Sequence, residues 1–260
     1  MNTENTPAGT TPAGNVAHDY VERLLADADR FADAVMTGPL DSPVSGCTGW
    51  DLEQLTRHMA YTHRWAQHCV EHAQRPADGV IAEPEAGVDA TLLASWLRQG
   101  AGDLGAALRS ADPHSPTWHP FPVTKVTGVW ARRQAHETSI HRWDAQHAVG
   151  TADSIDAAFA SDGIDEYFNV ALPRTVIRDR LATPAGSVHV HCTDIDGEWL
   201  AWFDDDGYHL VAEHRKGDAA LRGPAEQLLL ALYQRDGDRS DLSPVGDEAV
   251  LNAWFQPLGL

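Results

Sequence analysis

The chain has 260 residues, enough for one large domain or two ordinary ones. Hydrophobic residues make up 43% of it, so the chain can bury a core, which argues against global disorder. Lys and Arg number 19 against 38 Asp and Glu, which gives a formal net charge of −19. This acidic balance argues against nucleic-acid binding and against electrostatic docking on an anionic membrane.

The cysteines and the N-terminus point to a protein of the cell interior. Cys47, Cys69 and Cys192 are odd in number and form no C-x-x-C pair, as is typical of a reducing compartment without disulfides. No apolar run approaches the roughly 20 residues of a membrane span, and the first residues lack the basic-then-apolar order of a signal peptide. We expect a cytoplasmic monomer or weak homodimer with no membrane partner, whose residues 1–15 form a disordered tail.

The first part of the chain, residues 16–175, has a helical period. Apolar residues recur at steps of three and four in four segments: 16–36, 52–69, 92–108 and 125–149. Thr48 is the expected N-cap of the second helix. A fifth, shorter helix is expected from Ile155 to Val170, ending before Pro173.

The second part, residues 185–260, changes to the alternation of β-strands. The expected elements are strands at 187–193, 198–203 and 208–211, a hairpin turn at 204–207, and helices at 225–234 and 249–255. The sequence therefore predicts the fold class α plus α+β, with a helical bundle at 16–175 followed by a small α+β domain at 185–260.

The segment 125–149 carries the candidate chemistry. On a helical wheel, at about 100° per residue, ionisable and apolar side chains share one narrow stripe: Val126, Trp130, Arg133, Glu137, Ile140, His141, Asp144 and Ala148. Because unpaired buried charge is costly, this mixed stripe indicates a polar pocket inside the bundle.

Three side chains on two helices have the spacing of a metal site. Glu137 and His141 stand four residues apart, so both point to the same spot. His58, about 50° from the centre of the apolar stripe of the second helix, also points inward. Two histidines and one glutamate suit Zn²⁺ and leave a fourth position open. Two alternatives remain: a surface Glu–His pair, which 14 histidines make easy by chance, and the facial triad of a non-haem iron oxygenase.

Other histidines have weaker patterns. His63, His68 and His72 lie away from the apolar stripe of the second helix, so we expect them at the rim or in solvent. His189 and His191 alternate along a strand, which is typical of one solvated sheet face.

Three blocks carry a family resemblance. The segment SGCTGWDLEQLTRH (45–58) and the segment RQAHETSIHRWD (133–144), with its E-x-x-x-H-R-W-D pattern, resemble the mycothiol-dependent maleylpyruvate isomerase family, within the DinB-like metal-binding bundles. CTDIDGEW (192–199), followed by LRGPAEQLLL (221–230), is similar to the small, sterol-carrier-like C-terminal domain of that family. The resemblance covers roughly residues 16–257 and implies a DinB-like four-helix bundle.

The resemblance implies a zinc site built from His58, Glu137 and His141. It also implies that mycothiol, a small thiol, supplies the nucleophile, which bound Zn²⁺ would hold as thiolate. Addition of the thiolate to an activated double bond, rotation and expulsion would give cis–trans isomerisation. The same addition to an electrophile with a leaving group would give S-transfer.

Three further residues are predicted to act beside the metal. The family pattern has an arginine at the position of Arg222, facing the cleft, and this residue also precedes a helix N-terminus, which favours an anion. Arg133 would help attract a substrate to a protein of this charge, and Asp144 would orient a histidine.

The predicted partner is a small-molecule electrophile, with carboxylates among the candidates. A non-enzymatic alternative is a binding or stress-related bundle that keeps the metal but has lost the thiol. Binding of mycothiol that depends on His58 would distinguish the enzyme from that alternative.

Overall fold

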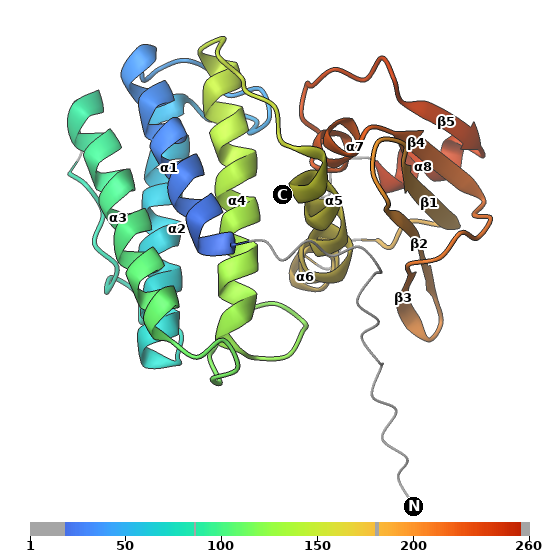
Figure 1. The fold of residues 1–260 in the computed structure, drawn as a ribbon, viewed down its shortest axis with the longest axis horizontal. Helices are drawn as coiled ribbons and strands as arrows, with labels where there is room; N and C mark the ends of the chain where they lie inside the picture. The colour runs from blue at the N-terminus through green and yellow to red at the C-terminus, as the bar shows by residue number, and fades with distance from the viewer. Residues whose placement is uncertain (1–18, 86, 180–181, 256–260) are drawn as a thin grey trace, which may run out of the picture.

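The protein has two halves that lie side by side (Figure 1). The computed structural model describes residues 19–85, 87–179 and 182–255, so the tail expected at 1–15 lies outside the described residues. One half is a bundle of four long helices, and the other holds a five-stranded sheet with helices against it. The predicted fold class, α plus α+β, is confirmed.

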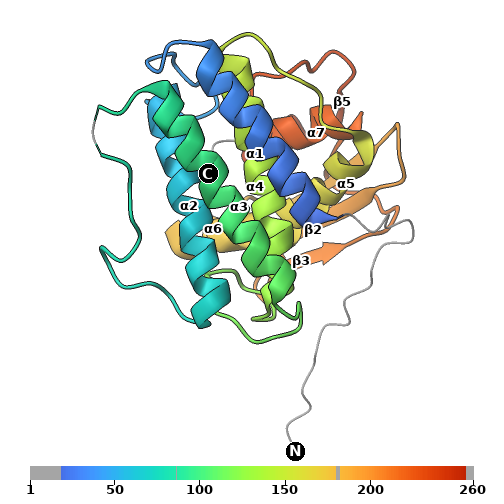
Figure 2. The same ribbon diagram turned by 60° about the vertical axis from the view of Figure 1, so that its left-hand side comes forward.

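The bundle helices match the four segments of helical period. They are α1 (Tyr20–Thr37), α2 (Leu52–His72), α3 (Ala90–Ser110) and α4 (Thr127–Ala148). Each helix packs against two neighbours, in the cyclic order α1–α3–α2–α4 (Figure 2). Because α2 and α4 are neighbours, the helices that carry the predicted metal ligands face one another.

The start of α2 differs from the prediction. Asp51, not Thr48, is the N-cap: its carboxylate accepts from the Gln54 amide at 2.8 Å, and the Gln54 side chain accepts from the Asp51 amide at 3.1 Å. The preceding loop closes on itself, since the Val44 amide donates to the Trp50 carbonyl, and Thr48 lies in the turn of that loop. Thr48 is held in this loop, so the helix begins after it and Asp51 forms the capping box with Gln54.

The fifth helix does not end before Pro173, so that prediction is wrong. The chain continues from α5 (Ala157–Glu166) through the π-helical turn η1 (Tyr167–Ala171) into α6 (Leu172–Asp179). At the junction the Leu172 amide donates to the Tyr167 carbonyl, five residues back. Proline removes a backbone donor, and a π-turn is where a helix changes its hydrogen-bond register, so the chain passes Pro173 without leaving the helix.

The sheet has the strand order β3-β2-β1-β4-β5, with β1 and β4 parallel and the other pairs antiparallel. Its strands are β1 (Ser187–Cys192), β2 (Glu198–Asp204), β3 (Gly207–Val211), β4 (Ala219–Gly223) and β5 (Ser243–Gly246). The first three and the hairpin turn between β2 and β3 confirm the prediction, whereas β4 and β5 were not predicted. The predicted helices correspond to α7 (Ala225–Leu232) and α8 (Glu248–Trp254).

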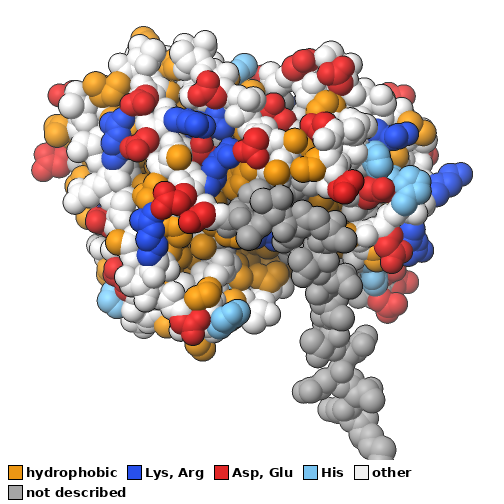
Figure 3. Space-filling view, in the orientation of Figure 1, with side chains coloured by type: hydrophobic (Ala, Val, Ile, Leu, Met, Phe, Trp, Pro, Cys, Tyr) orange, Lys and Arg blue, Asp and Glu red, His pale blue; other side chains and the backbone are white. Residues whose placement is uncertain are grey.

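One face of the sheet is covered by helices. Inward-facing strand residues such as Val190 and Trp199 share a core with Phe159 of α5, Leu229 of α7 and Trp254 of α8. Trp143 of α4 belongs to the same core, so α4 lies at the boundary between the halves. Acidic side chains are scattered over both halves on the face shown in Figure 3. None of the described helices is long and apolar enough to cross a membrane.

Candidate active site

His58 of α2 and the pair Glu137 and His141 of α4 meet between the two helices. The Nε2 atoms of His58 and His141 each lie 3.6 Å from the same oxygen, Oε1 of Glu137. One potential ligand atom from each residue lies within 4.8 Å of the other two. Ligand atoms around a tetrahedral Zn²⁺ stand about 3.4 Å apart, as follows from bonds of about 2.1 Å. The three side chains therefore fit a single divalent ion with little movement.

His141 is held from its other nitrogen by a buried carboxylate. Its Nδ1 lies 2.9 Å from Oδ2 of Asp144, and the Asp144 side chain is completely buried. Burial disfavours the protonated imidazole, but the hydrogen bonds and charges of Asp144 and Cys47 together outweigh burial and raise the pKa of His141. With Nδ1–H donating to Asp144, the lone pair of Nε2 faces Glu137, which is the orientation of a metal-ligating histidine.

Asp144 is itself fixed by an arginine from the other half of the protein. Arg235, just beyond α7, donates to both Asp144 oxygens, at 2.9 and 2.7 Å. Burial would raise the pKa of Asp144, but the Arg235 charge lowers it, so the carboxylate stays ionised. Gly46 allows this approach, because a Cβ there would lie 2.6 Å from Asp144 Oδ1 and 2.8 Å from Arg235 Nε.

A second arginine holds Glu137. Arg133 is buried and donates through NH2 to Glu137 Oε2, leaving Oε1 toward the two histidines. Its NH1 donates to Glu166 at 2.6 Å and to the hydroxyl of Tyr233 at 3.2 Å. The two carboxylates offset the free-energy cost of burying the Arg133 charge. The hydrogen bond from Arg133 also fixes the orientation of the Glu137 side chain.

His58 is the more open of the two histidines. Its side chain is 35% exposed, and its ring lies 5.0 Å from the Trp50 ring and 5.5 Å from the His141 ring, measured between centroids. Burial, with a smaller effect of His141, lowers the pKa of His58 to about 4. The imidazole is therefore neutral at pH 7, the form that binds metal ions.

The three side chains lie at the wall of a cavity of about 670 Å³ between the bundle and the C-terminal half. Aromatic and apolar side chains such as Trp50, Trp65 and Ile140 form part of its lining. Cys47 and Arg174, the latter from α6, line it as well. A cavity of this size has room for a small molecule beside the three candidate ligands.

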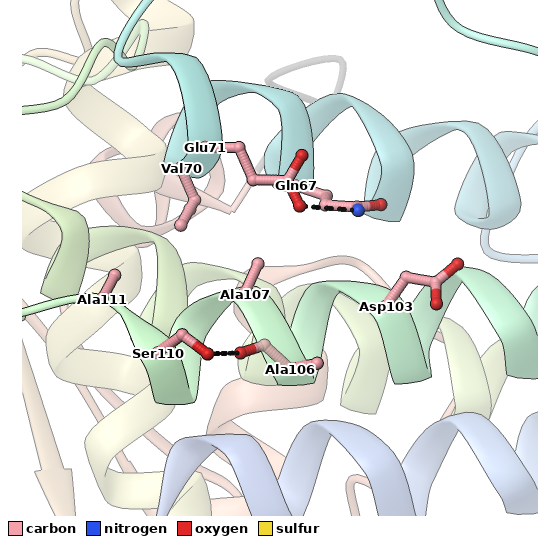
Figure 4. A pocket seen from close by; sticks show the side chains of 8 residues that line it. All are labelled: Gln67, Val70, Glu71, Asp103, Ala106, Ala107, Ser110 and Ala111. Carbon is pink, nitrogen blue, oxygen red and sulfur yellow. Dashed lines mark hydrogen bonds between the residues drawn. The ribbon is translucent and has the colours of Figure 1, made fainter.

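Another hollow, of about 480 Å³, lies between α2 and α3 (Figure 4). Its lining includes Glu71 and Asp103, with a hydrogen bond of 2.9 Å between Gln67 and Glu71, and three alanines. No histidine, cysteine or arginine is among the described residues that line it. It offers no chemistry comparable to that of the larger cavity.

The structure does not bring Arg222 into this site. Arg222 lies on β4, where its side chain is exposed, and it is not among the described residues that line the cavity. Its strand neighbour in the register is His191, on the face of the sheet turned away from the helices. The alternation of β4 decides this placement, because Leu221 takes the inward-facing position beside it.

His63 also differs from its prediction. Instead of lying at the rim, it is completely buried, and its Nε2 lies 2.9 Å from the hydroxyl of Thr138 on α4. Because α2 packs closely against α4, the buried face of α2 is wider than the stripe of apolar residues in its sequence and includes His63.

Sequence reasoning missed Arg235, Glu166 and Tyr233. Arg235 follows Gln234, whose left-handed φ of 59° ends α7 and turns the chain back toward α4. No local pattern marks these residues, because their partners lie on α4 in the other half of the chain.

Two family models match the chain. The model of the mycothiol maleylpyruvate isomerase N-terminal domain matches residues 21–146, and that of the MDMPI C-terminal domain matches residues 158–253. None of the curated proteins compared with the chain matches it.

Two solved structures have the same fold. The crystal structure of a mycothiol-dependent maleylpyruvate isomerase has a TM-score of 0.56 and 11% identity, over 86% of this chain and 91% of that one. A mutant of that isomerase with one histidine replaced by alanine has a TM-score of 0.53 and 9% identity, over the same shares. At such identities the likeness shows the fold alone, whereas the family models compare sequence. Because those two models match consecutive parts of one chain, residues 21–146 and 158–253, the protein belongs to the mycothiol-dependent maleylpyruvate isomerase family and is an enzyme.

Proposed function

We propose that this enzyme is a zinc-dependent isomerase in which the metal activates a small thiol, mycothiol, as the nucleophile. The observation that carries the proposal is the convergence of His58, Glu137 and His141 on one spot at the cavity wall. Their donor set, two imidazoles and a carboxylate, is that of catalytic zinc sites, which keep a position open for a further ligand. Bound zinc would stabilise the thiolate form of that thiol at neutral pH.

The protein's own residues would prepare the ligands for this role. Asp144 and Arg235 keep Nδ1 of His141 as the hydrogen-bond donor, which leaves Nε2 for the metal. Arg133 holds one oxygen of Glu137, so the other oxygen faces the histidines. The apolar part of the lining, including Trp65 and Ile140, limits the water that can compete with the thiol.

We propose that a substrate carboxylate binds to Arg174. The cavity lies in a protein of net charge −19, so an anionic substrate needs a local cation. Arg174 lines the same cavity from α6, with its guanidinium 5.6 Å from the centre of the Phe121 ring.

The test measures zinc and thiol-dependent turnover together. His58→Ala and Glu137→Gln should each release one zinc per chain, measured by metal analysis, and abolish mycothiol-dependent isomerisation of maleylpyruvate, the substrate named for the structural neighbours. His68→Ala is the matched control, because His68 is on the same helix but lies outside the cavity lining, with its ring centroid 4.4 Å from that of His72. It should keep both zinc and activity.

Two outcomes would contradict the proposal. Full zinc occupancy in both ligand variants would show that the metal is bound elsewhere. Iron in protein purified without added metal, together with oxygen uptake, would assign the three ligands to an iron enzyme instead. If mycothiol forms a stable adduct with the electrophile and no isomer appears, the zinc-activated thiolate serves S-transfer.

A further inference from the structure

A second group of metal-ligand side chains lies in the C-terminal half, on the sheet face turned away from the helices. His189 and His191 lie two residues apart on β1, so both point to that face, and Glu198 of β2 pairs with His191 in the register. His214 comes from the segment 212–218, which connects β3 to β4. One potential ligand atom from each of the four lies within 4.8 Å of the other three. Figure 3 shows histidine side chains gathered at the right-hand side, over this half of the protein.

The imidazoles surround one carboxylate. Nε2 of His189 lies 3.2 Å from Glu198 Oε2, Nδ1 of His191 lies 3.3 Å from Oε1, and Nδ1 of His214 lies 2.6 Å from Oε2. Two of these distances are close to the roughly 3.4 Å between ligands of a tetrahedral zinc ion. The contacts of His189 and His214 with Glu198 are hydrogen bonds. The His214 side chain is 81% exposed, so it can shift outward to admit an ion.

His189 is buried and His191 is partly buried, unlike the solvated face that the alternation predicted. The His189 side chain is 8% exposed and that of His191 is 22% exposed. Nδ1 of His191 is buried and has no hydrogen-bond partner, since its approach to Glu198 lacks hydrogen-bond geometry. A buried nitrogen lone pair without a donor is unfavourable, and a cation bound among these side chains would satisfy it.

The segment 212–218 explains the burial. Because β4 lies beside β1 while β3 is at the edge, this connection must cross β2 and β1. It crosses on the face of His189 and Leu200, since a Cβ at Gly217 would come within 3.1 Å of the His189 amide nitrogen and the Leu200 side chain. At its end Asp218 accepts hydrogen bonds from the amide and the hydroxyl of Ser187.

We propose that His189, His191, Glu198 and His214 form a structural site for a divalent d-block cation such as Zn²⁺, which fastens the crossing segment to the sheet. Four protein ligands leave no open position, as is typical of structural rather than catalytic zinc. The ion would link two adjacent strands to a connection that is otherwise exposed at residues 212–216. The site is separate from the cavity, which none of its four residues lines, so it does not depend on the proposed catalytic metal.

Proteolysis of the full-length chain tests the fastening. Arg215 and Lys216 are exposed in the segment and are trypsin sites. Addition of Zn²⁺ to metal-free protein should slow cleavage after these residues at least tenfold, as followed by mass spectrometry. His214→Ala should remove this protection without unfolding the protein, because the side chain is mostly exposed. The matched control is His209→Ala. His209 lies on β3, on the same face of the sheet as His189, but it is bonded to Asp204, so this variant should keep the protection.

Zinc stoichiometry provides the second readout. A chain with both His58→Ala and His141→Ala should still bind one zinc in equilibrium dialysis, and adding His191→Ala should abolish that binding. In this background, His214→Ala should raise the dissociation constant at least tenfold. The proposal fails if zinc does not slow cleavage at 215 and 216, or if the double variant binds none. It also fails if binding is unaffected by loss of His191 or His214.

Discussion

Two buried charged side chains beside the candidate metal site, Asp144 and Arg133, are paired within the protein itself. The Asp144 side chain has no exposed surface, but it receives two hydrogen bonds from Arg235 and one from His141. Arg133 lies between Glu137 and Glu166. Breaking one such pair leaves the partner buried and uncompensated, so single substitutions here should cost more than the direct contact is worth.

The Asp144–Arg235 pair should tune metal affinity without binding the metal. Asp144→Asn keeps the size of the side chain but removes the charge that fixes Nδ1–H of His141. We expect zinc affinity to fall about 10–100-fold, with the metal still bound by the same three ligands. Competition with a chelator of known affinity measures this. An unchanged dissociation constant would mean that His141 needs no such partner.

Arg174 and Arg222 make a matched pair for substrate binding. Arg174→Ala removes a cation from the cavity lining, so KM for a carboxylate substrate should rise about tenfold or more, while zinc content stays the same. Arg222→Ala removes an exposed cation on β4 outside the lining, so steady-state kinetics should not change. The reverse result would return the substrate-binding role to Arg222, as the family resemblance predicted.

At the scale of elements, α4 joins the two halves because it is polar on more than one side. Its residues Arg132 and His136 both bind Asp162 of α5, at 2.8 and 2.7 Å, while Glu137 and His141 face α2. The stripe on the helical wheel indicated only the side that faces the cavity. The partner of the second polar side is Asp162 on α5, and the sequence of α4 alone does not indicate that α5 packs there.

Asp162 should stabilise the protein in a pH-dependent way. Burial alone would raise its pKa, but the hydrogen bond with His136 and the charge of Arg132 lower it well below 3.8. The nearby Tyr20 hydroxyl is neutral, its pKa being raised by burial and by Asp162. A folded-state pKa below the unfolded value gives stability that is present above about pH 4 and is lost as pH falls further.

Asp162→Asn should therefore lower the free energy of unfolding by about 3 kcal/mol at pH 7. The difference from the parent protein should shrink by about 1.4 kcal/mol per pH unit below about pH 4. Urea unfolding of both proteins from pH 7 to pH 3 measures this. A difference that stays constant over that range would show that Asp162 does not gain its stability from being ionised.

At the scale of the molecule, the candidate metal centre lies where three parts of the chain meet. The loop before α2 supplies Cys47, the helices α2 and α4 supply the ligands, and the turn after α7 supplies Arg235. The buried cores on either side are built from apolar residues, such as Phe31 and Leu97 in the bundle and Val190 in the sheet half. We therefore expect the fold to persist without a bound metal.

Metal removal should accordingly lower stability without unfolding the protein. A site occupied at about 100 times its dissociation constant contributes about 2.7 kcal/mol. For a chain of this size that corresponds to a fall in Tm of about 5–10 °C for each site emptied. Thermal unfolding with and without a chelator measures the shift, and circular dichroism at 25 °C should show the helices intact. Loss of the helical signal on chelation would instead make the metal a requirement for folding.

The sequence by itself determined the helices of the bundle, the first three strands, and the three candidate ligands. Periodicity reports which face of an element is buried, and a spacing of four residues brings Glu137 and His141 together whatever surrounds them. It could not determine β4 and β5, because Ala-Ala-Leu-Arg-Gly and Ser-Pro-Val-Gly lack β-branched alternation. The first forms a strand beside β1, and the second forms a strand beside β4.

Only the tertiary structure decided which arginine lies at the candidate site. Arg222 and Arg235 flank the same helix in the sequence, and nothing local distinguishes them. Strand pairing turns the first toward the outer face of the sheet, and the left-handed turn at Gln234 directs the second to Asp144. The same pairing collects His189, His191 and Glu198 under a crossing segment. Contacts between residues far apart in sequence depend on how the helices and strands pack together. The periodicity of a single helix or strand does not predict that packing.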